Sequence, residues 1–203
     1  MVKFDKVTIR YDEKTVISDL SFTVAKGEQL ILAGESGKGK TTILNTIMGF
    51  VLPSKGEVYV DGLLLNDNNI KQIRTKISWL PQQVNIYANT VEELFFSVFN
   101  LKENKKFYPD KKKTEETFAS LNLSVELLNR RIDEISGGQK QRIILASLLI
   151  LDKPVFLLDE PTSALDSENS KNIFDLLKEK NKTVIAATHD RYWIENSDKI
   201  IEL

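Results

Sequence analysis

Apolar and polar residues alternate along two stretches near the start of the chain, residues 2–11 and 16–24. This period of two predicts a pair of antiparallel strands, which a turn at residues 26–28 closes. Further short runs rich in apolar residues predict strands at residues 29–33, 57–62, 77–80, 155–158, 183–187 and 199–203. The run at 155–158 is apolar throughout, as expected for a parallel strand that is buried on both faces.

Helices are predicted where apolar residues recur at intervals of three and four. The segments with this pattern are residues 43–48, 66–76, 90–99, 114–122, 124–130, 139–151 and 167–180. Two of them start with a capping box, Thr90 with Glu93 and Ser136 with Gln139, which satisfies the first free N–H groups of a helix. Because strands are missing from about 84 to 135, the pattern predicts an all-helical insert in an α/β framework.

The sequence GESGKGKTT, residues 34–42, lies between the strand at 29–33 and the helix that follows it. It matches the P-loop pattern, with glycines at 34 and 39 before Lys40 and Thr41. Glycines let successive N–H groups point at phosphate oxygens, and the helix, which is predicted to open near Lys40, adds its positive dipole end. Lys40 can reach the β- and γ-phosphates, and the Thr41 hydroxyl can ligate Mg²⁺. The loop predicts a nucleotide site and by itself leaves kinase, GTPase and ATPase equally open.

The composition mainly excludes certain partners and kinds of site. The 203 residues are 41% hydrophobic and carry a net charge of −1, so one large or composite globular domain is expected, without global attraction to nucleic acid or anionic membranes. The absence of cysteine excludes disulfides and thiolate metal sites. The N-terminus lacks the apolar core of a signal peptide, and the longest apolar stretch, 143–151, is too short to cross a membrane. We therefore expect a cytoplasmic protein that reaches any membrane through another chain.

Two acids follow the buried strand at 155–158. Asp159 and Glu160 stand at its carboxyl end, where open α/β sheets bind ligands, and adjacent acids there are costly unless engaged. With a P-loop present, Asp159 suits Mg²⁺ through a water molecule, and Glu160 suits orienting or polarising an attacking water. His189, the single histidine, ends the next apolar strand. A lone histidine is usually a packing or surface residue, but its position at the matching strand end favours a functional role.

Three other features are ambiguous by themselves. Tyr11 at a strand end is typical of a half-buried packing residue. The stretch 102–113 carries six lysines and two aromatic residues, yet interspersed acids favour a solvated loop over a nucleic-acid or lipid site. Gly137 and Gly138 at a helix start expose N–H donors that suit an anion, although an ordinary helix cap is the simpler interpretation.

Together these segments resemble the nucleotide-binding domain of an ABC-type ATPase over nearly the whole chain. The family motifs occur in order: the A-loop aromatic at Tyr11, Walker A at Gly34–Thr42, the Q-loop at Gln82, the signature at Ile135–Gln139, Walker B at Val155–Glu160, the D-loop at Ser163–Asp166 and the switch histidine His189. The glycine signature has no use in a kinase or GTPase. The resemblance implies one α/β domain: a P-loop NTPase core with a mostly parallel sheet (1–83 and 152–203), an N-terminal antiparallel β subdomain and an α-helical insert (about 84–151).

The resemblance also implies ATP and Mg²⁺ as cofactors and a role for each motif. Tyr11 would stack on adenine with Val16 beside it, and Thr41, Gln82 and, through water, Asp159 would place Mg²⁺. The phosphates would be held by Walker A, namely Gly34, Glu35, Ser36, Gly37, Lys38, Gly39, Lys40, Thr41 and Thr42. The catalytic residues would be Lys40, Gln82, Glu160 and His189, with Glu160 acting on the attacking water. The residues that close over ATP held by a second subunit would be Ser136, Gly137, Gly138, Gln139 and Asp166.

A head-to-tail dimer around two ATP molecules would follow from this resemblance, either a homodimer or a heterodimer with another ATPase chain. Its closing and opening would move an integral membrane transporter subunit docked beside the Q-loop and the helical insert. Residues 129–134 lack the TEVGE-like stretch of many fused exporters, which points to a separately encoded ATPase subunit, peripheral on the inner face of the cell membrane. No nucleic-acid partner is expected, and the transported substrate and its direction stay open.

Two other functions are compatible with parts of the sequence. A soluble ABC-type ATPase switch in translation or DNA repair usually carries tandem nucleotide domains or a long coiled-coil insert, and this chain has neither. A module that holds nucleotide without turnover is disfavoured because Glu160 and His189 are both present. An ATPase subunit that drives transport through a separate membrane protein is therefore the leading hypothesis.

Overall fold

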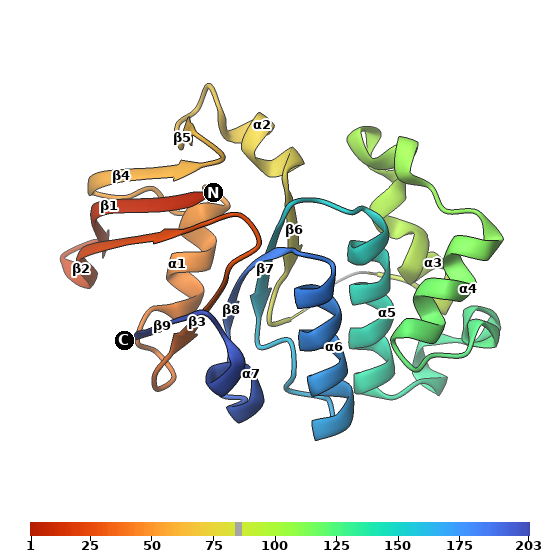
Figure 1. Cartoon of the computed structure of the whole chain (residues 1–203). Coiled ribbons are helices and arrows are strands. Elements are labelled where there is room, and N and C mark those ends of the chain that lie inside the picture. Colours follow the sequence, from red (N-terminus) through yellow and green to blue (C-terminus); the bar gives the residue numbers. More distant parts are fainter. Residues whose placement is uncertain (84–86) are drawn as a thin grey trace.

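The computed structural model describes residues 1–83 and 87–203 and contains two sheets (Figure 1). The first is antiparallel, in the order β2-β1-β4-β5, and consists of β1 (Val2–Tyr11), β2 (Lys14–Val24), β4 (Lys55–Val60) and β5 (Leu63–Leu64). The predicted strands at 2–11 and 16–24 are confirmed as this sheet's main hairpin. The two-residue β5 was not predicted, because so short a segment cannot display a period.

The second sheet is parallel throughout and has the order β6-β7-β8-β3-β9. Its strands are β6 (Ile77–Leu80), β7 (Val155–Asp159), β8 (Thr183–Ala187), β3 (Gln29–Ala33) and β9 (Lys199–Glu202). Successive residues of β7 enter different hydrophobic clusters: Phe156 packs with the helical side of the molecule, and Leu157 packs with the antiparallel sheet. The predicted burial of this strand on both faces is confirmed, because a hydrophobic core packs against each face of the sheet.

Helices cover both faces of the parallel sheet. On one face, α1 (Lys40–Ile47) shares a core cluster with the antiparallel sheet, and α2 (Ile70–Thr75) leads into β6. On the other face, α5 (Gly137–Ile150) and α6 (Ser167–Glu179) run side by side in Figure 1, with the short α7 (Arg191–Asn196) before β9. Within residues 1–83 and 87–203, no helix combines the length and the apolar character needed to span a membrane.

The insert lies on the far side of α5 from the antiparallel sheet (Figure 1). Its elements are α3 (Val91–Phe96), α4 (Lys111–Ser120) and four 3₁₀ helices, η1 (Ser97–Asn100), η2 (Lys102–Phe107), η3 (Val125–Asn129) and η4 (Ile132–Glu134). The expected start of the insert, at about residue 84, lies outside the described residues. An isolated antiparallel bridge between Thr90 and Arg131 joins the two ends of the segment.

Several local predictions in the insert were wrong in detail. The predicted helix at 124–130 is a 3₁₀ helix, and the one at 90–99 changes to 3₁₀ after Phe96. The expected solvated loop at 102–113 contains η2, and Tyr108 stacks on Phe96 with ring centroids 4.9 Å apart. Thr90 caps α3 as predicted, but the Glu93 carboxylate accepts the N–H of Asn89 instead of the N–H of Thr90. The bridge beside it is made by the N–H of Val91 to the Arg130 carbonyl and the N–H of Ile132 to the Asn89 carbonyl.

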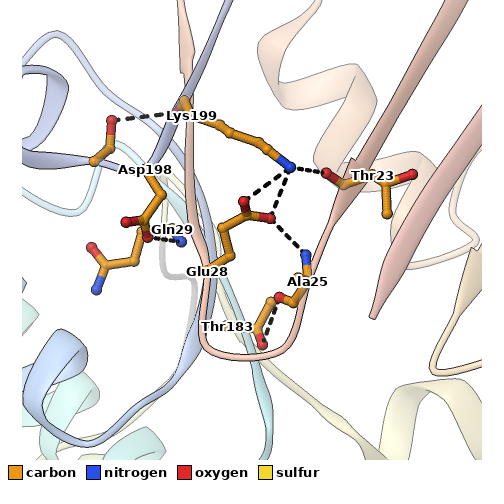
Figure 2. Close-up of polar contacts among 8 residues, drawn as sticks. Thr23, Ala25, Glu28, Gln29, Thr183, Asp198 and Lys199 are labelled. Carbon is orange, nitrogen blue, oxygen red and sulfur yellow. Dashed lines mark hydrogen bonds and ion pairs between the residues drawn. The ribbon is translucent and has the colours of Figure 1, made fainter.

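Polar contacts tie together the amino ends of the parallel strands (Figure 2). Lys199, at the start of β9, donates to the carbonyl of Thr23 at 2.8 Å and pairs with the Glu28 carboxylate at 2.9 Å. Asp198 accepts the N–H of Gln29, the first residue of β3, at 2.8 Å. These contacts join β2, β3 and β9 at one end of the sheet. They hold the strands in place, and the loops that follow the strands lie at the opposite, carboxyl end.

Candidate functional site

The loop at residues 34–42 connects β3 to α1, so the predicted order of strand, loop and helix is confirmed. Gly39 precedes α1 with φ 103°, a backbone conformation that side chains with a Cβ rarely adopt. A Cβ at this position would also lie 2.8 Å from Cδ1 of Ile17 on β2. No described side chain caps α1, so its first N–H groups stay available to a bound anion.

Lys40 lies at the centre of the loop and is 7% exposed. Its ammonium donates to the carbonyls of Gly34 at 2.6 Å and Glu35 at 3.0 Å. The same nitrogen is 3.4 Å from Nε2 of His189, which follows β8. The buried positive charge is therefore held where the carboxyl ends of β3 and β8 meet.

Asp159 and Glu160 stand at the carboxyl end of β7, as predicted. Asp159 is 3% exposed, and burial raises the pKa of its carboxyl against the lowering effects of a hydrogen bond from Thr41 and the charge of Lys40. Burial likewise raises the pKa of Glu160, and the charges of His189 and Lys40 oppose that shift. One Glu160 oxygen lies 3.5 Å from Nε2 of His189. Both carboxyls are thus next to cationic or donor groups that favour their ionised forms.

A cleft of about 700 Å³ collects these groups. Its lining residues are Val16, Ser36, Gly37, Gly39, Lys40, Thr41, Thr42, Gln82, Asp159 and Glu160, and all of them are among those singled out from the sequence. The other predicted residues Gly34, Glu35, Lys38 and His189 do not line it. Tyr11 is not among the lining residues, and its side chain, at the end of β1, is 46% exposed. The arrangement offers backbone donors, one ammonium and oxygen ligands around a single space, which suits a phosphate chain with its metal ion.

The glycine signature lies apart from this cleft, at the start of α5. The capping box is confirmed: the Ser136 hydroxyl accepts the N–H of Gln139, and the Gln139 side chain accepts the N–H of Ser136. The helix starts at Gly137, two residues earlier than predicted, because both glycines join its first turn. Asp166 caps α6 by accepting the N–H of Asn169 at 2.8 Å. Neither Ser136–Gln139 nor Asp166 is among the residues that line the cleft at the loop 34–42.

The signature instead packs on the loop after β7. A second cavity, of about 500 Å³, lies between the segment Leu80–Gln82, the first turns of α5, and Ser163 and Ala164. A Cβ added to Gly138 would meet the carbonyl oxygen of Ala164 at 2.4 Å, whereas one added to Gly137 would meet only the Ala164 Cβ at 3.7 Å. Gly138 thus has a packing role that the sequence analysis did not include.

Gln141 is a site residue that the sequence analysis missed. Its side-chain amide donates to the backbone carbonyl of Glu160 at 3.0 Å. Its spacing in the sequence could have pointed to it, because Gln141 follows Gly137 by four residues and therefore lies on the same face of the helix. Spacing alone did not reveal what that face contacts.

A pair of glycine substitutions tests the close approach of α5 to Ala164. Gly138→Ala is expected to lower the free energy of unfolding by about 1–3 kcal/mol, because the new methyl group must displace a backbone carbonyl. Gly137→Ala, which meets only ordinary contacts, is expected to leave it unchanged or raise it by up to about 1 kcal/mol. Urea unfolding of both variants measures the difference, and equal stabilities would contradict the packing role of Gly138.

Comparison with known proteins extends the picture over the whole chain. The family model described as ABC transporter matches residues 17–163. The energy-coupling factor transporter ATP-binding protein EcfA1 of Mycoplasmopsis synoviae is 35% identical over 200 residues, covering 94% of this chain and 74% of that protein. The ATP-dependent lipid A-core flippase of Burkholderia pseudomallei is 33% identical, and the match covers all of this chain but 35% of the flippase. The dimeric post-hydrolysis structure of the ATP-binding cassette MJ0796, bound to ADP and Pi, matches with a TM-score of 0.81 and 32% identity over 100% of this chain and 94% of that one.

Proposed function

The chain belongs to the ABC transporter family, and from this membership we propose how its residues use ATP and what the subunit drives. It is an ATP-binding and ATP-hydrolysing subunit of such a transporter. The observation that carries the residue assignments is the single cleft in which the P-loop, Asp159 and Glu160 meet.

In this proposal the nucleotide lies along the loop at 34–42. The free N–H groups at the start of α1 and the Lys40 ammonium bind the phosphates, exchanging loop carbonyls for phosphate oxygens. Val16 lines the cleft and packs against the nucleoside. Tyr11 stacks on the adenine from the end of β1, for which its exposed ring is available.

The donors in the cleft fit Mg²⁺. Thr41 and Gln82 supply neutral oxygens and Asp159 a carboxylate, the oxygen set that a small hard cation accepts alongside phosphates and water. When bound, the ion would neutralise charge on the β- and γ-phosphates. Thr41 and Gln82 would hold the ion, and Asp159 would act on it through water.

Hydrolysis in this proposal depends on Glu160 and His189. The Glu160 carboxylate orients the attacking water and accepts its proton, and burial strengthens it as a base by raising its pKa. His189, 3.5 Å away, contacts the γ-phosphate and helps to place that water. Lys40 stabilises the negative charge that develops on the phosphoryl oxygens.

The raised pKa of Glu160 predicts the acid side of the pH profile. A base must be ionised, so kcat/KM should fall as pH falls through the pKa of Glu160, at a pH above its ordinary value of 4.5. Asp159 is adjacent and also has a raised pKa, so the apparent value belongs to the pair. Steady-state ATPase rates from pH 4.5 to 8 measure this limb. A limb at or below the ordinary carboxyl pKa, or the same limb in Glu160→Gln, would contradict the role.

The signature acts across a dimer in this proposal. Because the start of α5 does not reach the cleft of its own chain, Ser136, Gly137, Gly138 and Gln139 close over ATP held by a second subunit, with Asp166 beside them. The partner is a second copy or a related ATPase chain. The dimeric structure of the related cassette supports a two-subunit form.

The work of the dimer is to drive an integral membrane subunit. We place the chain in the cytoplasm, peripheral on the membrane that its partner spans, because it belongs to a transporter family as an ATP-binding subunit. Capture of tagged protein from detergent-solubilised host membranes, with and without ATP, tests this part. Recovery of an integral membrane transporter subunit is expected. Enrichment of ribosomal or DNA-repair proteins without any membrane protein would overturn it.

A further inference from the structure

Three hydrogen bonds fix the peptide groups of Glu160 on both sides. Its N–H donates to the carbonyl of Ala187, the last residue of β8, at 2.8 Å. Its carbonyl accepts from the side-chain amide of Gln141 on α5 at 3.0 Å and, at the longer distance of 3.3 Å, from the N–H of Ser163. The carboxylate that the proposed mechanism uses is therefore anchored through its backbone to a strand on one side and to the signature helix on the other.

The backbone of Glu160 needs such an anchor. Its φ is 48°, in the left-handed region that a residue with a Cβ rarely adopts. The hydrogen bond from Gln141 favours the orientation of the following peptide that this conformation requires. Rotation about the N–Cα bond, which would relax φ, moves the carbonyl and the side chain together and would carry the carboxylate away from His189, which lies 3.5 Å from it. Holding the carbonyl thus holds the direction of the carboxylate.

The helix that carries Gln141 is tightly connected to the motifs around it. Gly137 and Gln141 are one turn apart on the same face of α5, and both line the second cavity. Arg142 donates to the carbonyls of Leu121 and Asn122 at 2.9 Å and to the side chain of Asn169 at 3.0 Å. A displacement at the start of α5 therefore reaches the Glu160 carbonyl through a rigid helix.

Stability does not explain the choice of glutamine at this position. The Oε1 atom of Gln141 is buried and has no hydrogen-bond partner among the described residues. A buried acceptor without a partner is unfavourable, and an apolar side chain of similar length would avoid that cost. The amide is useful here for the donor that it presents to Glu160.

We propose that Gln141 is a positioning residue for ATP hydrolysis: its amide holds the Glu160 carbonyl and thereby aims the carboxylate at the attacking water. The proposal rests on the assigned role of Glu160 as the base. In this proposal the signature helix contacts the base of its own chain, so α5 sets the geometry of hydrolysis in its own cleft. The first turn of the same helix contacts the nucleotide that the partner subunit binds.

Two substitutions separate this role from packing. Gln141→Met removes the donor and keeps the length, and kcat is expected to fall roughly 10- to 100-fold, the scale of a small misplacement of a reacting group. Gln141→Glu keeps the shape, but its ionised form has no donor, so kcat should fall at least as far. Equilibrium ATP binding should change less than about twofold, because Gln141 does not line the P-loop cleft. The thermal midpoint of Gln141→Met should stay level or rise.

The matched control is Gln72→Met, which makes the same change on the exposed side of α2 and should retain wild-type turnover. Glu160→Gln provides the reference for the mechanism. Adding Gln141→Met to it should lower the residual kcat less than about twofold, because both changes act through one group. Full turnover by Glu160→Gln would remove the proposed base itself. If Glu160→Gln loses turnover to the expected extent, the role of Gln141 is overturned by a wild-type kcat in Gln141→Met, or by a loss that adds in full to the residual kcat of Glu160→Gln.

Discussion

A Glu160→Gln subunit is expected to bind ATP and fail to hydrolyse it, with kcat lowered about 10²- to 10⁴-fold. The substitution keeps the size of the side chain and removes the carboxylate that lies 3.5 Å from His189. Since the proposed dimer opens only after hydrolysis, the variant should accumulate as an ATP-bound dimer. Phosphate release measures the first effect, and light scattering with excess ATP and Mg²⁺ measures the second.

The control for this experiment is Glu195→Gln, which makes the same charge change at an exposed position of α7. It should turn over ATP at the wild-type rate. Undiminished phosphate release by Glu160→Gln would contradict the role of Glu160 as the base. A variant that saturates with ATP and stays monomeric would contradict the homodimer. The proposal would then require a heterodimer with a different ATPase chain.

Lys40→Ala should nearly abolish ATP binding. Replacing an ammonium that bonds to phosphate removes charge-assisted hydrogen bonds of about 1.5–3 kcal/mol each, so one or two such bonds correspond to a loss of affinity of roughly 10- to 10⁴-fold. The nitrogen also donates to the carbonyls of Gly34 and Glu35, so the loop loses two internal contacts with the substitution. Equilibrium titration with ATP and Mg²⁺ measures the affinity.

Two comparisons make this result specific. Lys71→Ala removes an exposed lysine from α2 and should bind ATP normally. Thermal unfolding of Lys40→Ala without nucleotide shows whether the loop contacts matter for the fold, and Lys40→Met, with a longer apolar chain, fills more of the same space. Undiminished ATP binding in both Lys40 variants would refute the assignment of the phosphate site.

Local features of the site followed from the sequence because they depend on neighbouring residues. The loop at 34–42 needs glycine at Gly39, where φ is 103°, and the helix after it starts at the predicted lysine. The cap of α5 depends on Ser136 and Gln139, three residues apart, and it formed as predicted. The apolar run before Asp159 predicted a doubly buried strand, and every residue of β7 is buried.

Prediction was weaker where tertiary contacts compete with local preference. The Glu93 carboxylate accepts the N–H of Asn89 instead of the N–H of Thr90, in a segment whose backbone pairs with residues 130–132, about forty positions further along the chain. The segment at 102–113 was interpreted from its charges, whereas its aromatic residues anchor it, with Tyr108 stacked on Phe96. In both cases a partner outside the local window determined the geometry.

The sequence by itself determined the strand, loop and helix of the phosphate site, the buried strand that presents Asp159 and Glu160, and the cap of the signature helix. The tertiary structure alone decided that Lys40 lies 3.4 Å from His189, 149 positions away, that Gly138 abuts Ala164, and that Gln141 holds the carbonyl of Glu160. The physical reason is that periodicity and capping report which face of an element is buried. What that face contacts depends on how distant elements pack against one another.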